Sequence, residues 1–143
     1  PTFNHPYLKD DNDVCLNINS ILKFKTNIIE TKNLQPEELI QIISEFDGVI
    51  SSRLHGAIFA TLANVPTVHI YSEHKGKGFF STYFKNNVCL ISIDDILKSN
   101  MTKKILQFLN QSNVSEEYSK IIAEFKEESL KIFSRKLESI GII

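Results

Sequence analysis

Two short apolar runs rich in β-branched residues flank one apolar helical run, and this alternation limits the fold more than any other feature of the chain. The two runs are GVIS at 48–51 and PTVHIY at 66–71, and the helical run between them covers Leu54–Asn64. A strand, a crossover helix and a second strand predict neighbouring parallel strands. The sequence therefore predicts an α/β fold with a Rossmann-like parallel sheet flanked by helices.

The rest of the chain continues this alternation. Residues 1–13 are polar and contain two prolines, so we predict a linker or entering segment there, followed by a single domain over 14–143. The sheet core is expected at about 26–93 and a C-terminal helix at about 116–140. The other predicted elements are strands at Asn27–Glu30 and Val88–Ile93 and helices at Val14–Phe24, Pro36–Phe46, Phe79–Phe84 and within Asp95–Leu109.

Composition excludes several classes of protein. With 42% hydrophobic and 23% charged residues, a chain of 143 residues is expected to be one soluble globular domain. The formal net charge of −1 and the absence of a basic run give no electrostatic footprint for nucleic acid. The four histidines and two cysteines lack metal-ligand spacing, so we predict no metal site. Cys15 and Cys89, each between Val and Leu, are expected to be buried thiols, and a disulfide between them stays open.

Arg53 and His55 lie where the first apolar strand becomes a helix. Ligands of parallel sheets bind beyond the carboxyl ends of the strands, where the free N–H groups of the next helix favour negative charge. Arg53 adds a planar fork of donors for a carboxylate or phosphate, and His55 can transfer a proton near neutral pH. A lone histidine is more often structural than catalytic. Here, however, Arg53 is one of only two arginines, and residues 48–85 carry a balance of +3.

The segment SEHKGKGFF at 72–80 follows the second strand. It fits a solvated loop with a charge cluster, but it also follows a strand end on the same edge of the sheet as Arg53 and His55. Its two lysines, Lys75 and Lys77, are therefore candidate anion ligands.

These residues together resemble the C-terminal region of polysaccharide pyruvyl transferases. The resemblance covers roughly 34–90, with an aspartate-led strand, an Arg-Leu-His element, a Val-Pro, a strand ending at a tyrosine, and a lysine-containing loop leading to Gly-Phe. Its counterparts here are Asp47, Arg53, Leu54, His55, Val65, Pro66, Tyr71, Lys75 or Lys77, Gly78 and Phe79.

The resemblance implies that this chain is the C-terminal half of a two-domain enzyme of GT-B architecture, and we expect the isolated domain to be inactive without its N-terminal partner. Members transfer a pyruvyl group from phosphoenolpyruvate to two sugar hydroxyls, which gives a ketal on a cell-surface polysaccharide or its lipid-linked precursor. The implied location is cytoplasmic, with lipid-linked acceptors at the inner face of the membrane, and no cofactor is implied. The implied catalytic residues are His55 and Arg53, and the implied substrate-binding residues are Ser52, Arg53, Leu54, His55, Lys75 and Lys77.

Two other functions stay open. A GT-B glycosyltransferase or nucleotide-sugar epimerase would bind a nucleotide sugar at the same edge, commonly with an acidic residue on the ribose. Glu73 is the acid available in the predicted loops, and it lies beside lysines that suit a further phosphate better. A non-catalytic module of a polysaccharide assembly would instead use the apolar C-terminal helix to dock a partner.

Overall fold

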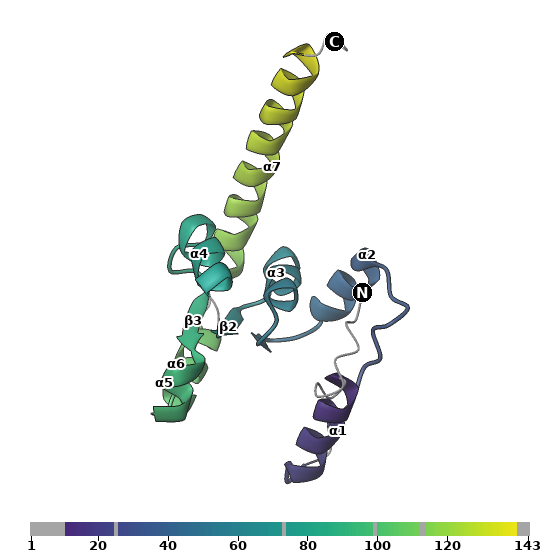
Figure 1. Ribbon diagram of the computed structural model, residues 1–143, viewed down its shortest axis with the longest axis vertical. Coiled ribbons are helices and arrows are strands. Elements are labelled where there is room, and N and C mark those ends of the chain that lie inside the picture. Colours follow the sequence, from purple (N-terminus) through teal and green to yellow (C-terminus); the bar gives the residue numbers. More distant parts are fainter. Residues whose placement is uncertain (1–10, 25, 73, 99, 112–113, 140–143) are drawn as a thin grey trace. The chain divides into compact units, whose positions relative to one another are not determined.

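The computed structural model describes residues 11–24, 26–72, 74–98, 100–111 and 114–139, without the side chains of 133 and 136–139. The chain separates into two compact units, Pro1–Leu34 and Gln35–Ile143, which are described one at a time. The second unit contains the sheet and the predicted site residues. Figure 1 shows the order of the elements along the chain.

The described residues of the first unit contain one helix, α1 (Asp11–Ile21), which begins three residues before the predicted start. The predicted strand at Asn27–Glu30 is wrong, because this segment has no strand assignment and pairs with none of the three described strands. Its two isoleucines, Ile28 and Ile29, are exposed. An apolar β-branched run forms a strand only where a neighbouring strand completes its backbone hydrogen bonds, and no described strand does so here. Cys15 on α1 is also exposed, contrary to the expectation of a buried thiol, and both cysteines are free.

The second unit is built on a three-stranded parallel sheet in the order β1–β2–β3. The strands are β1 (Val49–Ser51), β2 (Thr67–Tyr71) and β3 (Cys89–Ser92). Ser51 pairs with His69, and Tyr71 pairs with Ser92. The prediction of an α/β fold with a parallel sheet flanked by helices is thereby confirmed.

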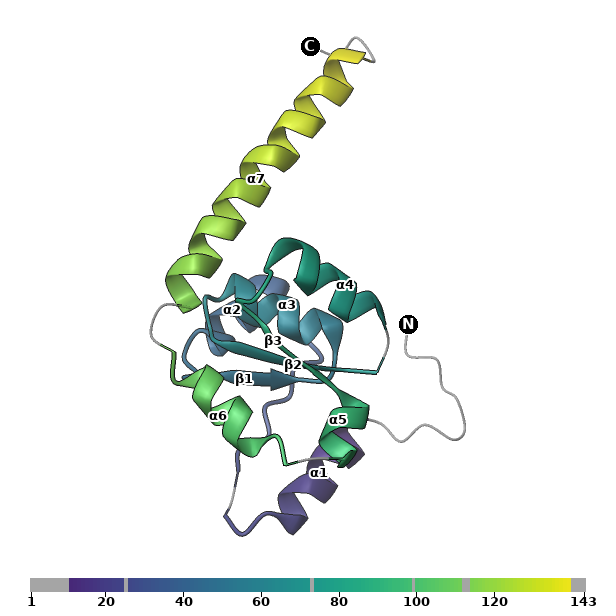
Figure 2. The ribbon, with the colours of Figure 1, turned by 90° about the vertical axis from the view of Figure 1, so that its left-hand side faces the viewer.

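Helices cover both faces of this sheet. Helices α3 (Leu54–Leu62) and α4 (His74–Tyr83) lie on one face, and α6 (Thr102–Leu109) lies on the other, as Figure 2 shows. Helix α2 (Pro36–Ile43) starts with proline in its first turn, and the Glu38 carboxylate accepts a 2.8 Å hydrogen bond from the Gln35 N–H. A short helix, α5 (Ile93–Lys98), follows β3 directly. The buried core between the layers includes Ala57, Val68, Phe80, Phe84, Ile91, Phe108 and Tyr118.

Helix α4 is longer than the sequence predicts. It begins at His74, so Lys75 and Lys77 lie in its first turns and not in a loop. Glycine disfavours helices by about 1 kcal/mol relative to alanine, which is why two glycines at 76 and 78 indicated a loop. Gly76 is buried against His69, where an added Cβ would overlap the imidazole Nε2. Tertiary packing that only glycine permits therefore overrides its poor helix propensity.

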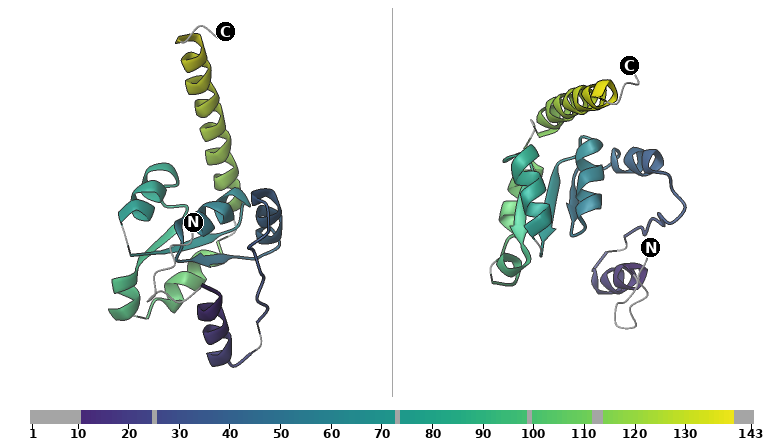
Figure 3. Two further views of the ribbon diagram at one scale, coloured as in Figure 1. Left: turned by 45° about the vertical axis from the view of Figure 1, so that its right-hand side comes forward. Right: turned by 45° about the horizontal axis from the view of Figure 1, so that its top comes forward.

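The last helix, α7 (Val114–Ser139), is a single long helix, as predicted, and Figure 3 shows its uninterrupted course. Its first turns are buried, with Val114 and Tyr118 in the core, whereas Leu130 and Ile132 are exposed. Among the described side chains of α7, the predicted apolar stripe packs on the sheet layers in its first part, through residues such as Ile121 and Ile122. No helix among the described residues is long and apolar enough to cross a membrane.

Candidate functional site

The predicted site residues follow the carboxyl ends of two neighbouring strands. Strand β1 ends at Ser51 and leads through Ser52 and Arg53 into α3, and β2 ends at Tyr71 and leads into α4. Because β1 and β2 are parallel and hydrogen-bonded, these two strand ends lie at the same edge of the sheet. The fold therefore places the N-termini of α3 and α4 at one edge.

The turn between β1 and α3 is held by the side chain of Ser51. Its hydroxyl donates to the Arg53 carbonyl at 2.8 Å and accepts from the Arg53 N–H at 3.2 Å. Both hydrogen bonds are local and fix the backbone of Arg53 in an extended conformation, with φ −93° and ψ 132°, immediately before the helix. The serine that organises the turn is thus Ser51, and not the predicted ligand Ser52, which is exposed.

The first turn of α3 presents backbone N–H groups to the same edge. Arg53 is the N-cap residue, and its side chain makes no capping hydrogen bond. The first intrahelical bond runs from the Ala57 N–H to the Arg53 carbonyl at 3.1 Å. Helix geometry leaves the N–H groups of residues 54–56 without partners inside the helix, and such groups attract anions.

Gly56 allows this first turn to approach Ser51. A Cβ placed on Gly56 would lie 2.7 Å from the Ser51 hydroxyl oxygen, which is closer than real Cβ contacts allow. A larger residue would have to displace the hydroxyl that holds Arg53. Gly56 therefore supports the turn, although it carries no functional group.

Arg53 and His55 are both exposed, whereas Leu54 between them is half-buried and packs against the core. The apolar residue anchors the first turn of the helix, and the side chains of the two polar residues on either side of it are exposed. The first turn of α3 therefore brings a guanidinium and an imidazole to the same strand-to-helix junction.

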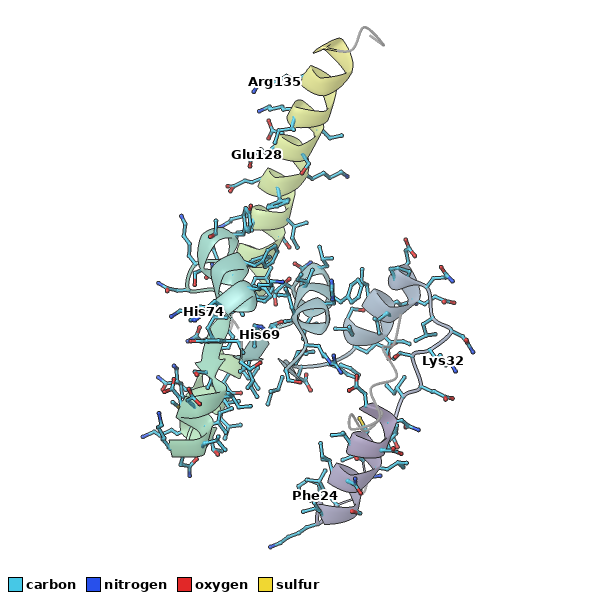
Figure 4. All side chains as sticks on the ribbon, viewed as in Figure 1. Phe24, Lys32, His69, His74, Glu128 and Arg135 are labelled. Carbon is cyan, nitrogen blue, oxygen red and sulfur yellow. The ribbon has the colours of Figure 1, made fainter. Side chains whose placement is uncertain are left out.

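Of the two candidate lysines, Lys77 has the better-defined position. Its Nζ lies 5.9 Å from the ring centroid of Tyr71, the last residue of β2. This cation–π contact holds the ammonium group towards the strand end. Lys75 is two positions earlier in the helix and therefore points to a different side. Figure 4 shows His74 at the start of the same helix and His69 on β2.

Sequence reasoning missed four residues that shape this site: Ser51, Gly56, His69 and Gly76. His69 is buried on β2 with its Nδ1 3.1 Å from the Ser51 carbonyl oxygen. A signal was present for Gly56, because it lies within the helical pattern of Leu54–Asn64, where glycine indicates close packing, whereas Gly76 lies in a stretch that the sequence predicts as a loop. Nothing in the sequence singled out Ser51 over Ser52, or His69 over the other histidines.

The described residues also form an open hollow of about 380 Å³ away from this edge. It lies between the end of α4 and the first half of α7, and the lining includes Tyr83, Lys85, Glu117, Glu124 and Phe125. None of the predicted site residues contributes to it. Within the part of the chain that the structure describes, no three His, Cys, Asp or Glu residues are grouped so that they could hold a metal ion.

The comparison with protein families gives one match. A family model described as Polysaccharide pyruvyl transferase matches residues 3–74, which is half of the chain. The matched stretch contains Ser51, Arg53, Leu54 and His55, and it ends at His74, so Lys75 and Lys77 lie beyond it. No curated protein and no solved structure matches the chain. On the strength of the match over residues 3–74, the chain belongs to the polysaccharide pyruvyl transferase family, a family of transferases.

Proposed function

We propose that this chain binds phosphoenolpyruvate and supplies the donor site for transfer of its pyruvyl group to two hydroxyls of a sugar. The observation that carries this proposal is the exposure of Arg53 and His55 at the N-terminus of α3, inside the stretch that matches the family. The donor carries a carboxylate and a phosphate, and this edge of the sheet combines a guanidinium, a helix N-terminus and Lys77.

Arg53 would bind one anionic group of the donor in a bidentate manner. The N–H groups at the start of α3 would bind the same group, because the Ser51 hydroxyl fixes the backbone immediately before them. Lys77, held over Tyr71, would neutralise the second anionic group. Leu54, which packs against the core, and Ser52, which is exposed beside Arg53, complete the donor-binding set.

His55 would act as the general acid. It protonates the methylene carbon of phosphoenolpyruvate, and positive charge develops on the adjacent carbon, which bears the phosphate ester. A sugar hydroxyl attacks that carbon and loses its proton, which restores the acid form of His55. The C–O bond to phosphate then breaks, and the second hydroxyl attacks the same carbon to close the cyclic ketal and gives its proton to the released phosphate. The products are the ketal and inorganic phosphate, and Lys77 or Lys75 stabilises the leaving phosphate.

The acceptor would be a cell-surface polysaccharide or its lipid-linked precursor, held partly by a second Rossmann-like half in a GT-B arrangement. This part of the proposal rests on the family and on the composition of the edge described here, which offers groups for an anion. It places the reaction in the cytoplasm, where phosphoenolpyruvate is made, at the inner face of the membrane where lipid-linked acceptors lie.

A titration with phosphoenolpyruvate, followed by thermal unfolding and by amide chemical shifts, tests the donor site. A ligand that binds only the folded state at one hundred times its Kd stabilises it by about 2.7 kcal/mol. Arg53→Ala should weaken binding roughly 10- to 100-fold, because hydrogen bonds to charged groups contribute about 1.5–3 kcal/mol. The matched control is Arg135→Ala, which removes an exposed arginine of α7 and should leave binding unchanged.

Three outcomes distinguish the candidates. Binding of phosphoenolpyruvate that is lost in Arg53→Ala and kept in Arg135→Ala supports the proposal. Preference for a uridine nucleotide would instead indicate a glycosyltransferase or epimerase. Equal binding by both arginine variants would refute the role of Arg53.

The acid role of His55 has a separate test in the full enzyme with its acceptor. His55→Ala should lower kcat by about 10²- to 10⁴-fold, the usual contribution of a general acid, while donor affinity changes little. An unchanged kcat would show that another group protonates the donor.

A further inference from the structure

The imidazole of His69 lies between the two elements that form the donor edge. His69 is 2% exposed, and its Nδ1 is 3.1 Å from the carbonyl oxygen of Ser51, its register partner on β1. A carbonyl oxygen can only accept, so Nδ1 carries the hydrogen and donates it. The same serine holds the backbone of Arg53 through its hydroxyl. One residue therefore connects the imidazole to the Arg53 turn.

The other side of the ring lies against α4. Gly76, in the first turn of α4, is buried, and a Cβ added to it would overlap Nε2 of His69. One turn later, the Phe80 ring lies with its centroid 5.4 Å from that of His69. The first two turns of α4 therefore rest on the imidazole, and Lys77 lies in this part of the helix.

We propose that His69 is a positioning residue that sets the spacing between the Arg53 turn and the first turn of α4. The ring is buried and contacted on both sides, so a change at Gly76 is transmitted through it to Ser51 and Arg53. The consequence for function rests on the donor site proposed above: the spacing decides whether Arg53 and Lys77 reach the two anionic groups of one small ligand together. His69 itself would not touch the ligand.

The chemistry of the side chain explains why histidine is needed at this position. Leucine or phenylalanine would fill much of the volume but could not donate to the Ser51 carbonyl. Asparagine places an N–H donor close to the position of Nδ1 and can replace that function. The pair His69→Leu and His69→Asn therefore separates the hydrogen bond from the filling of space.

The two glycines of α4 offer a second matched pair. Gly76→Ala places a methyl group against the imidazole, whereas Gly78→Ala lies in the same helix with nothing within 4 Å of its added Cβ. Both substitutions improve helix propensity equally. A difference in affinity or chemical shift between Gly76→Ala and Gly78→Ala therefore reports the contact with His69 and not a change in the stability of the helix.

The first measurement uses no ligand. Amide chemical shifts of residues 52–55 should change in Gly76→Ala and stay at wild-type values in Gly78→Ala. Unchanged shifts in both variants would overturn the proposal. This result does not depend on phosphoenolpyruvate, so it stands even if Arg53→Ala shows that the donor assignment is wrong.

The second measurement is phosphoenolpyruvate affinity, with thermal unfolding to confirm that each variant is folded. His69→Leu should bind roughly 5- to 30-fold more weakly, the range for losing one buried hydrogen bond, and His69→Asn should recover most of the affinity. In a protein that already carries Arg53→Ala, His69→Leu should cause no further loss of affinity, because His69 acts through Arg53. If Gly76→Ala does not fold, the histidine pair decides: equal affinity in His69→Leu and wild type overturns the proposal.

Discussion

The hydroxyl of Tyr118 provides a sharp test of how α7 is attached to the sheet. Tyr118 is fully buried, and its hydroxyl oxygen accepts a hydrogen bond of 3.3 Å from the backbone N–H of Thr67, 51 residues away in sequence. Thr67 precedes Val68, the first residue of β2 that pairs with β3. The Tyr118 hydroxyl therefore accepts from an N–H at the start of β2, one residue before β2 begins to pair with β3.

The substitution Tyr118→Phe leaves this N–H without its partner while keeping the ring. A buried donor that loses its acceptor costs about 1–3 kcal/mol, and we expect about 1–2 kcal/mol because the bond is long and its acceptor is a neutral hydroxyl. For a chain of 143 residues that loss corresponds to a fall in Tm of roughly 3–7 °C. The rings of Phe84 and Tyr118, whose centroids lie 5.6 Å apart, should keep their edge-on contact.

The same residue gives a pH dependence with a defined sign. Burial raises the pKa of Tyr118 far above its ordinary value of 10.0, and the hydrogen bond from Thr67 offsets this only in part. Above about pH 10 the unfolded chain loses the phenol proton while the folded chain keeps it, so the unfolded state binds fewer protons and stability falls. The loss is about 1.4 kcal/mol for each pH unit. Phenylalanine has no such proton, so the cost of Tyr118→Phe should shrink to zero near pH 11 and then change sign.

Urea unfolding of both proteins at about pH 7, 9, 10 and 11 measures this difference, because all other titrating groups are common to the two chains. The control is Tyr83→Phe, which removes an exposed phenol. Tyr83 lies on α4, and its ring packs on Phe125 of α7, the helix that also contains Tyr118. A stability difference for Tyr118→Phe that stays constant from pH 7 to 11 would refute the argument from burial.

Two further predictions concern the turn and the thiols. Gly56→Ala should displace the Ser51 hydroxyl, since the new Cβ would lie 2.7 Å from it. We expect calorimetric titration to show several-fold weaker binding of phosphoenolpyruvate. Unchanged affinity would show that the turn adapts. A thiol reagent should modify the exposed Cys15 rapidly and the buried Cys89 only on unfolding. Burial raises the pKa of the Cys89 thiol and outweighs the opposing effect of Lys104. Equally fast labelling of both thiols would contradict this prediction.

The main elements of the second unit could be predicted because they depend on local pattern. Apolar runs of β-branched residues became β1, β2 and β3, and the proline and glutamate at the start of α2 gave a helix where the pattern places one. The parallel pairing of β1 with β2 also followed, since a crossover helix joins parallel neighbours.

The failures come from contacts between residues distant in sequence. Asn27–Glu30 has the composition of a strand but no described strand to pair with, and composition does not contain that information. Helix α4 begins at His74 because Gly76 fits against His69, and this contact depends on the distance between a strand and a helix. Sequence patterns report which face of an element is apolar, and they do not report which side chain lies opposite it.

The candidate site shows the same division between residues that stand out in the sequence and residues that do not. Arg53 and His55 stand out because charged and titratable groups are rare in an apolar strand-to-helix unit. Their supports, Ser51 and His69, act through a hydroxyl bonded to backbone and a ring bonded to a carbonyl, and both look ordinary in the sequence. A site for a small ligand with two anionic groups needs its donors fixed to within a fraction of an ångström, so these ordinary residues should control affinity nearly as strongly as the arginine does. With the proposed donor phosphoenolpyruvate as the ligand, the His69 and Gly76 variants therefore measure how much of the affinity comes from the placement of Arg53 and how much from its charge.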